Sequence, residues 1–233
     1  MWKAIWWKEW RETGWFLLIS AVLVFHSVGS QCGWSPLSAF DPFGISDSYS
    51  VFRSEHSFPF RGESPPMLAM FAIALFGIGV GLWQSLAESS RQTWLFLLHR
   101  PVPRSRLLLV KWAYGAIGTL ALVALGLGVG LWLSARPGSR PAPFEWVGVI
   151  PWWQAFFATT LFYSGAFLVG LRPAPWRGSR LLPLAALLGT SVVFNVETPA
   201  VWWWCGLMTL VMVGLHVVLV RLALTAAAGR DYP

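Results

Sequence analysis

The sequence predicts an all-α integral membrane protein, with an N-terminal amphipathic interfacial helix, six transmembrane helices and a cytoplasmic helix between the second and third of these. Three observations lead to this prediction. Of the 233 residues, 56% are hydrophobic and only 12% are charged, a composition unlike that of soluble domains of this size. Long apolar stretches recur along the whole chain. Many of the seventeen tryptophans stand in clusters, as expected of a chain that repeatedly crosses the membrane interface.

The N-terminal segment, residues 1–14, is expected to form a helix that lies along the membrane surface. At 3.6 residues per turn, Trp2, Trp6 and Trp10 fall on one stripe, and the charged residues between them point away. A bend near Gly14 would make this helix an elbow leading into the first span. The alternative is a plain extension of that span. No small-residue cleavage site follows convincingly, so we expect the segment to be retained.

Six apolar windows are long enough to cross a bilayer core of about 30 Å, which needs about 20 residues per helix. The first window is the least regular because His26 and Gln31 interrupt it, and a tight turn at 197–200 separates the last two. Five spans is the alternative count. The windows are residues 15–34, 67–87, 107–133, 146–171, 181–199 and 201–221.

The charges between these windows orient the chain. With a cytoplasmic N-terminus, thirteen of the seventeen Lys and Arg residues fall inside, and only Arg53, Arg61, Arg136 and Arg140 fall outside. This is the positive-inside pattern of a multi-pass protein of the cell membrane, with both termini in the cytoplasm. The formal charge of +7 is explained by this topology and calls for no nucleic acid as a partner.

One loop and two glycine pairs complete the outline of a single domain over residues 1–233. The outside segment 35–66 is rich in Ser, Pro and aromatic residues and is shorter than the roughly 40 residues that an independent core needs. It is either an irregular loop over the helix ends or a lid or docking surface for a partner. Glycines four residues apart let helix backbones approach closely. We therefore expect packing contacts at Gly77, Gly81, Gly126 and Gly130.

The sequence offers little for catalysis, and we expect no enzymatic activity and no cofactor in this chain. The only carboxylates assigned to the spans, Glu88 and Glu197, lie near span ends, and no HExxH or GxSxG motif is present. Cys32 and Cys205 have neither disulfide-framework nor zinc-ligand spacing. His26 and His216 are expected to be satisfied by neighbouring helices. No Walker A sequence is present, so energy for any driven process must come from a partner.

Residues 88–106 have the features of a docking segment at the cytoplasmic surface. Glu88 suits the N-terminal end of a short helix, where a carboxylate meets the positive end of the helix dipole. The apolar residues that follow are too few to cross the membrane, and the prolines end the helix. Such an apolar helix offers a surface that a soluble protein can bind. The residues concerned are Thr93, Trp94, Leu97, Leu98, Pro101, Pro103, Arg104 and, at the mouth of the third span, Lys111.

This run, "ESSRQTWLFLLHRPVPRSRLLLVKW", resembles the segment between the second and third spans of ABC-2 type ABC transporter permeases. That family typically has a glutamate, Gly-Thr, Leu-Leu, Pro-Val-x-Arg and a lysine that opens the next helix. The positions that match in order are Glu88, Thr93, Leu97, Leu98, Pro101, Val102, Arg104 and Lys111. The N-terminal "WKAIWWKEWRE" is similar to the family's amphipathic connecting helix. Gln92 stands where a glycine is usual, and the turn at 197–200 leaves little room for external re-entrant helices.

The resemblance implies the permease subunit of an exporter, which pairs with a second copy or a paralogue. Two separate ATPase subunits would bind ATP and Mg and would dock on the coupling helix formed by residues 88–99. Few charges inside the spans favour a lipidic or amphiphilic cargo. The substrate itself stays open, and so does a metal cargo near His56 and Cys32. The alternatives are a membrane assembly or scaffold protein without transport, and a membrane-embedded enzyme subunit.

Overall fold

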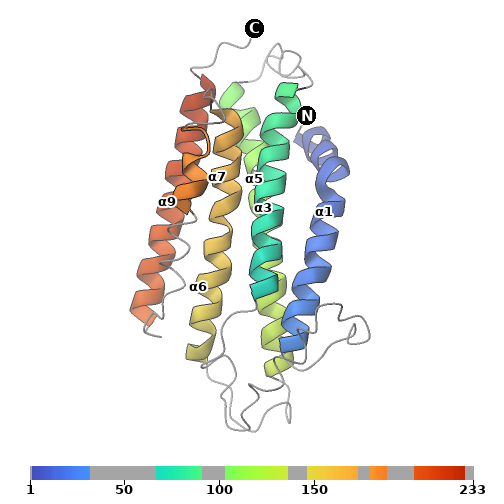
Figure 1. The fold of residues 1–233 in the computed structure, drawn as a ribbon, viewed down its shortest axis with the longest axis vertical. Helices are drawn as coiled ribbons and strands as arrows, with labels where there is room; N and C mark the ends of the chain where they lie inside the picture. Colours follow the sequence, from blue (N-terminus) through green and yellow to red (C-terminus); the bar gives the residue numbers. More distant parts are fainter. Residues whose placement is uncertain are drawn as a thin grey trace.

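The chain folds into a bundle of long helices (Figure 1). The computed structural model describes residues 2–31, 67–90, 103–135, 146–172, 179–187 and 202–228, and all secondary structure within them is helical. Five helical segments are long and apolar enough to cross a membrane, which indicates a membrane protein. They are α1 (Trp2–Gln31), α3 (Met67–Ser90), α5 (Arg104–Ser134), the consecutive α6 (Val149–Thr159) and α7 (Leu161–Leu171) after the short η2 (Trp146–Gly148), and α9 (Trp202–Ala228).

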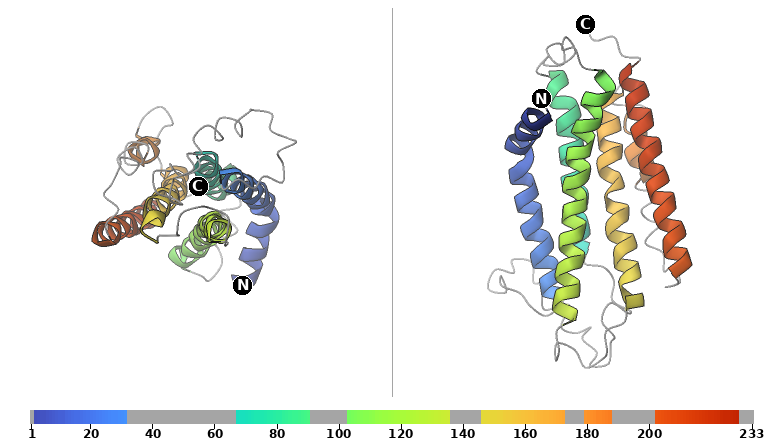
Figure 2. Two further views of the ribbon diagram at one scale, coloured as in Figure 1. Left: turned by 90° about the horizontal axis from the view of Figure 1, so that it is seen from below. Right: turned by 180° about the vertical axis from the view of Figure 1, so that it is seen from behind.

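The helices are arranged with α1 and α9 at opposite edges and the others between them (Figures 1 and 2). α3 packs mainly on α7, α1 packs on both α5 and α3, and α9 packs on α7. α1 and α5 run toward one end of the bundle, while α3, α6–α7 and α9 run toward the other (Figure 1). The first residues of α1 and the last residues of α9 therefore lie at the same end.

The direction of the last two long helices bears on the number of spans. α7 ends near the top of Figure 1 and α9 begins near the bottom, so the chain between Arg172 and Trp202 passes from one end to the other. Within that stretch, residues 182–187 are helical, and Leu187 is buried against α7. Most of the window 181–199 lies outside the described residues, so the count of six stays a prediction.

The sequence predicts an interfacial helix at 1–14 and a first span that starts at residue 15. The structure has no break between these two segments. α1 is one continuous helix, and its first turns run at an angle to the rest (Figure 2, left). The bend has a local cause, because the Thr13 hydroxyl donates a hydrogen bond to the Glu9 carbonyl oxygen (2.7 Å). Such back-bonding commonly bends a helix, and the adjacent Gly14 lets the Trp10 ring lie close.

The boundary of the second span also differs from the expectation. α3 continues to Ser90, so Glu88 belongs to its last turn and not to the start of a separate helix. The role of Glu88 in a coupling helix stays a prediction. Residues 91–102, with most of the expected coupling helix, and the loop 35–66 lie outside the described residues.

The crossing made of α6 and α7 forms the centre of the bundle. Almost every residue from Ile150 to Leu171 is buried, which agrees with a sequence that is apolar all round. The two helices meet at Thr160, where the hydroxyls of Thr159 and Thr160 each bond a carbonyl three residues back. This pair of hydroxyl contacts accounts for the local tightening that separates α6 from α7.

The glycines mark where backbones come together. Gly77 and Gly81 of α3 face α7, and a methyl group at Gly81 would come within 2.8 Å of the Tyr163 carbonyl oxygen. Gly126 of α5 faces Phe156 and Val24, and Gly130 is buried. These contacts place the glycine pairs at helix interfaces, where the missing side chain lets α3 and α7 approach closely.

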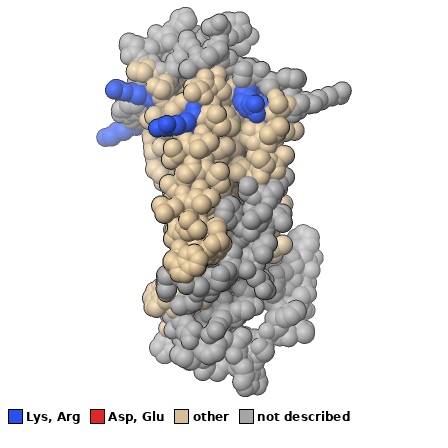
Figure 3. All heavy atoms as spheres, turned by 90° about the vertical axis from the view of Figure 1, so that its left-hand side faces the viewer, with Lys and Arg blue, Asp and Glu red and all other residues tan. Residues whose placement is uncertain are grey.

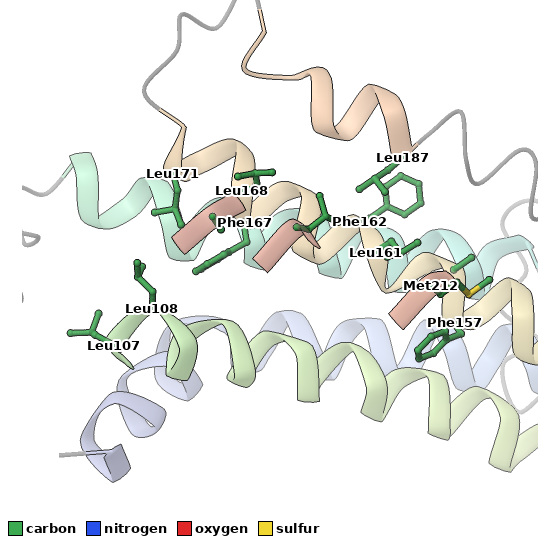
Figure 4. Packing of buried hydrophobic residues seen from close by; sticks show 13 residues of the cluster. Leu107, Leu108, Phe157, Leu161, Phe162, Phe167, Leu168, Leu171, Leu187 and Met212 are labelled. Atoms are coloured by element: carbon green, nitrogen blue, oxygen red, sulfur yellow. The ribbon is translucent and has the colours of Figure 1, made fainter. Parts of the chain in front are cut away.

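The surface divides into an apolar belt and a basic end. Inside, one apolar cluster joins α7, α9, the start of α5 and Leu187 (Figure 4). Outside, large apolar side chains such as Leu18 of α1 and Leu210 of α9 are exposed, as lipid-facing residues are. On the face seen in Figure 3, the described Lys and Arg residues gather near the end where α9 finishes, and the described surface below them carries none. The belt and the basic end agree with a membrane orientation set by positive charge.

The presence of a sixth span can be tested by the accessibility of engineered cysteines from outside the cell. In a variant with Cys32 and Cys205 replaced by serine, Thr198→Cys should react with a membrane-impermeant maleimide added to intact cells, because the 197–200 turn would lie outside. Ser179→Cys, at the basic end, should react only after the membrane is opened. Equal labelling of both positions in intact cells would contradict six spans.

The α3–α7 contact makes a second prediction. Gly81→Ala should lower stability by about 1–3 kcal/mol, because the added methyl group meets backbone atoms of α7 that cannot move aside freely. Gly79→Ala is the matched control in the same helix, since nothing lies within 4 Å of its Cβ position. It should be neutral or stabilising by up to about 1 kcal/mol. Thermal unfolding of the detergent-solubilised variants checks the order, and a Gly81→Ala protein that melts no lower than Gly79→Ala would contradict it.

Candidate functional site

A cluster of polar side chains lies inside the bundle, where α1, α3, α5 and α7 meet. The Lys111 ammonium nitrogen lies 3.1 Å from Glu9 Oε1, and both side chains are only 2% exposed. Gln84 and Tyr163 complete the cluster, with 2% and 0% exposure. A carboxylate and an ammonium at this depth are costly unless each is paired and hydrogen-bonded, so the cluster is the first place to look for function.

The hydrogen bonds of the cluster leave little ambiguity about its donors and acceptors. The Gln84 amide donates from Nε2 to Glu9 Oε2 (2.9 Å), and its Oε1 accepts from the Tyr163 hydroxyl (2.8 Å). A flipped amide would set its oxygen against the carboxylate, where neither group could donate. The Tyr163 hydroxyl also lies 2.9 Å from the Trp112 carbonyl oxygen of α5. Both carboxylate oxygens therefore have a donor, and four helices contribute to one network.

A second arm of the network holds the N-terminal part of α1 against α5. The Thr13 hydroxyl lies 3.1 Å from the Tyr114 hydroxyl, across the interface between the two helices. The ring of Tyr114 meets Trp6 edge-on, with ring centroids 5.4 Å apart. Trp6 is 37% exposed and Trp10 is 50% exposed, so the tryptophan stripe borders the lipid while Glu9 occupies the inner face.

The sequence explains how these residues meet. Glu9 and Thr13 are four residues apart and share one face of α1. Gln84 lies near the end of α3, and Lys111 lies near the beginning of α5, so the two are at a similar depth. Gly115 is what admits Tyr163, because a methyl group there would collide with the tyrosine ring. An alanine at Gly115 would displace the hydroxyl that orients Gln84.

A second polar group lies between α5, α7 and α9. His216 has a hydroxyl at each ring nitrogen: Ser164 at 2.8 Å from Nδ1 and Thr160 at 2.9 Å from Nε2. Trp112 donates from Nε1 to the Ser164 oxygen (3.1 Å), and Thr160 donates to the Phe157 carbonyl oxygen (2.7 Å). The proton of Thr160 is thus used, so His216 Nε2–H donates to Thr160 and Nδ1 accepts from Ser164. His216 is satisfied by neighbouring helices, as the sequence predicts. For His26 the same expectation is not met, because its Nδ1 is buried without a hydrogen-bond partner among the described residues.

The contact between Ser164 and His216 has the elements of a nucleophile and a base, but its geometry serves a structural role. Ser164 is 1% exposed, and its oxygen already accepts a hydrogen bond from the Trp112 ring. The second nitrogen of His216 is bound to a threonine hydroxyl, where hydrolytic triads have a carboxylate.

The structure places the predicted site residues in different surroundings. Lys111 was expected at the cytoplasmic mouth of the third span; it is instead turned into the bundle and bound to Glu9, so its ammonium is not presented to a soluble partner. Arg104 begins α5 directly after Pro103, which takes the N-cap position. The side chain of Glu88 and residues Thr93, Trp94, Leu97, Leu98 and Pro101 are outside what the structure describes.

Within the described ranges, no group of three or more His, Cys, Asp or Glu side chains lies close enough to hold a metal ion. Comparisons with protein-family models, with curated proteins and with solved structures give no match. The described part of the chain is a helical membrane protein whose helices are joined by a buried ion pair, with a further hydrogen bond to the carboxylate.

The ion pair makes a testable prediction about stability. Glu9→Gln should lower the free energy of unfolding by about 3–5 kcal/mol, because it leaves the Lys111 ammonium buried without a counter-ion. Lys111→Met should be similarly costly, while the double variant Glu9→Gln with Lys111→Met should recover much of the loss. Thermal unfolding in detergent checks this double-mutant cycle. Two single effects that simply add would show that the residues do not interact.

Proposed function

We propose that the chain is the transmembrane, or permease, subunit of an ABC transporter, acting as an exporter driven by separate ATPase subunits. The proposal rests on the resemblance of residues 88–111 and of the N-terminal helix to ABC-2 type permeases. Two ATPase subunits would dock on the cytoplasmic segment 88–106, and a second permease, identical or a paralogue, would complete the complex. ATP and Mg would be bound by the partners, and this chain would carry out no covalent chemistry.

The buried cluster is the observation that best supports this function. Segment 91–102 is bordered by α3 and α5, and each of these helices contributes a polar side chain to the network: Gln84 from α3 and Lys111 from α5. Both bind Glu9 of α1. A displacement of the segment would therefore move α1, α3 and α5 together, and α7 would follow through Tyr163.

The energetic side of the mechanism is a population shift. Closure of the ATPase subunits on ATP would favour one arrangement of the helices over another through contacts made at the docking segment. A bundle with close glycine contacts and a buried ion pair responds by moving helices as rigid bodies, since its interfaces do not deform continuously. The cell membrane, with both termini in the cytoplasm, is the location that this proposal requires. The described basic residues at one end of the bundle support that orientation.

The apolar interior supports a lipidic or amphiphilic cargo. Within the described spans, several charged and polar side chains deep in the bundle bind one another, as Glu9 does with Lys111 and His216 does with Ser164. None of these groups is left to line a polar path through the centre. A hydrophilic solute would need such a path, whereas an amphiphile can move along the outer face of the helices.

The docking role is tested by co-purification. Leu97→Asp should abolish recovery of an ATPase with the solubilised protein, because a carboxylate would have to be buried at the contact without a partner. Membrane insertion and thermal stability should be unchanged. Ser139→Asp is the matched control: it introduces the same charge in the 136–145 loop on the opposite side of the membrane. Mass spectrometry of the eluate and its ATP hydrolysis rate provide the measurement.

Two results would argue against the transporter. If the unaltered protein recovers no ATPase under conditions that preserve the complex, the docking segment serves another cytoplasmic partner, as in a membrane assembly or scaffold protein. If Leu97→Asp and Ser139→Asp recover the ATPase equally well, the ATPase binds elsewhere. The coupling role of segment 88–106 is then wrong.

A further inference from the structure

A groove lies between α5 and α9 on the outer face of the bundle. It has a volume of about 410 Å³, within the range of about 300–1,000 Å³ that small-molecule pockets have. Its walls are mostly apolar, with Leu120 from α5 and Val213 and Val217 from α9. These three side chains are 43–50% exposed, so the groove is open to the surrounding lipid along its length.

The polar residues at the groove do not make it polar, because their hydrogen bonds are made within the protein. Thr119 donates to carbonyl oxygens of its own helix, at 2.9 Å for Ala116 and 3.1 Å for Gly115. Thr160 and His216 bind each other. No polar atom in the floor needs a ligand partner. The body of the groove therefore suits a hydrocarbon chain and not a polar solute.

One end of the groove is different. Arg221 lines it, is exposed, and has no ion-pair partner among the described residues. It lies 19 residues after Trp202 in α9, which is about 28 Å along a helix and close to the 30 Å thickness of a bilayer core. With the tryptophans at the start of α9 at one interface, the guanidinium of Arg221 lies at the headgroup level of the other.

We propose that this groove binds an anionic phospholipid of the leaflet that contacts the basic end of the bundle, with one acyl chain between α5 and α9 and the phosphate on Arg221. A hydrocarbon tail gains little by leaving lipid for an apolar groove, since the two surroundings are alike. The selectivity of the site for an anionic lipid must therefore come from the charge of the guanidinium, because the phosphate of such a lipid is not neutralised by a headgroup ammonium as it is in phosphatidylcholine. The site does not depend on the proposed transport function.

The test is native mass spectrometry of the delipidated full-length protein titrated with phosphatidylglycerol or with phosphatidylcholine of the same acyl chains. The unaltered protein should retain phosphatidylglycerol with about a fivefold preference, the factor expected from one basic residue at the headgroup level. Arg221→Gln should abolish the preference. Arg11→Gln, which removes an exposed cation from the same end but not from the groove, should leave it unchanged.

A second variant tests the groove separately from the charge. Val217→Trp fills the groove from an exposed position of α9 and should reduce phosphatidylglycerol binding at least fivefold; Leu120→Trp does the same from α5 if the first variant folds poorly. Equal binding of the two lipids by the unaltered protein would overturn the proposal, and so would a preference that survives Arg221→Gln. If Val217→Trp changes the oligomeric state but not lipid binding, a second copy occupies the groove and the proposal is wrong.

Discussion

The buried pair of Glu9 and Lys111 constrains the bundle more than any other contact. Two opposite charges that are 2% exposed cannot separate without one of them losing its counter-ion in an apolar surrounding. Because Gln84 binds the second carboxylate oxygen of Glu9 and Tyr163 binds Gln84, the pair also fixes the depth of α1, α3, α5 and α7 relative to one another. Apolar contacts alone tolerate a shift of one helix along another. The polar network does not tolerate such a shift. It therefore specifies one arrangement of helices whose surfaces are otherwise similarly apolar.

Periodicity and composition were enough to predict the helical membrane class and the positions of five long helices. The spans 67–87, 107–133 and 146–171 agree with α3, α5 and α6–α7 to within a few residues, because an apolar run of that length has few other solutions. Gly77 and Gly81 lie at a helix contact for the same reason that their spacing indicated one. What these patterns cannot provide is which helices are neighbours, since most apolar faces fit one another.

The sequence analysis did not find the cluster around Glu9 and Lys111, because it placed each residue by its position relative to a span and did not compare their depths in the membrane. The sequence pattern around Glu9 indicates an interfacial segment, and Lys111 stands at the start of a span, where a basic residue is expected to face the cytoplasm. Neither residue was therefore assigned to the interior of the bundle. A usable signal did exist. Glu9, Gln84 and Lys111 all fall near the same predicted membrane surface, and polar residues at matching depth are expected to pair. The contact of His216 with Ser164 and Thr160 joins residues more than fifty positions apart, and no local pattern encodes it.

The bend in α1 has a consequence for how the chain is made. Glu9 is synthesised long before Lys111, so for a time its carboxylate lacks the counter-ion that it has inside the bundle. Since the first turns of α1 leave the axis of the rest, that part of the helix can wait at the water interface, where an ionised carboxylate is stable. Entry of α5 then supplies the ammonium, and the two charges become buried together. The elbow thus allows the first span to enter the membrane before Glu9 is buried. Burial of the unpaired carboxylate in lipid would be too costly.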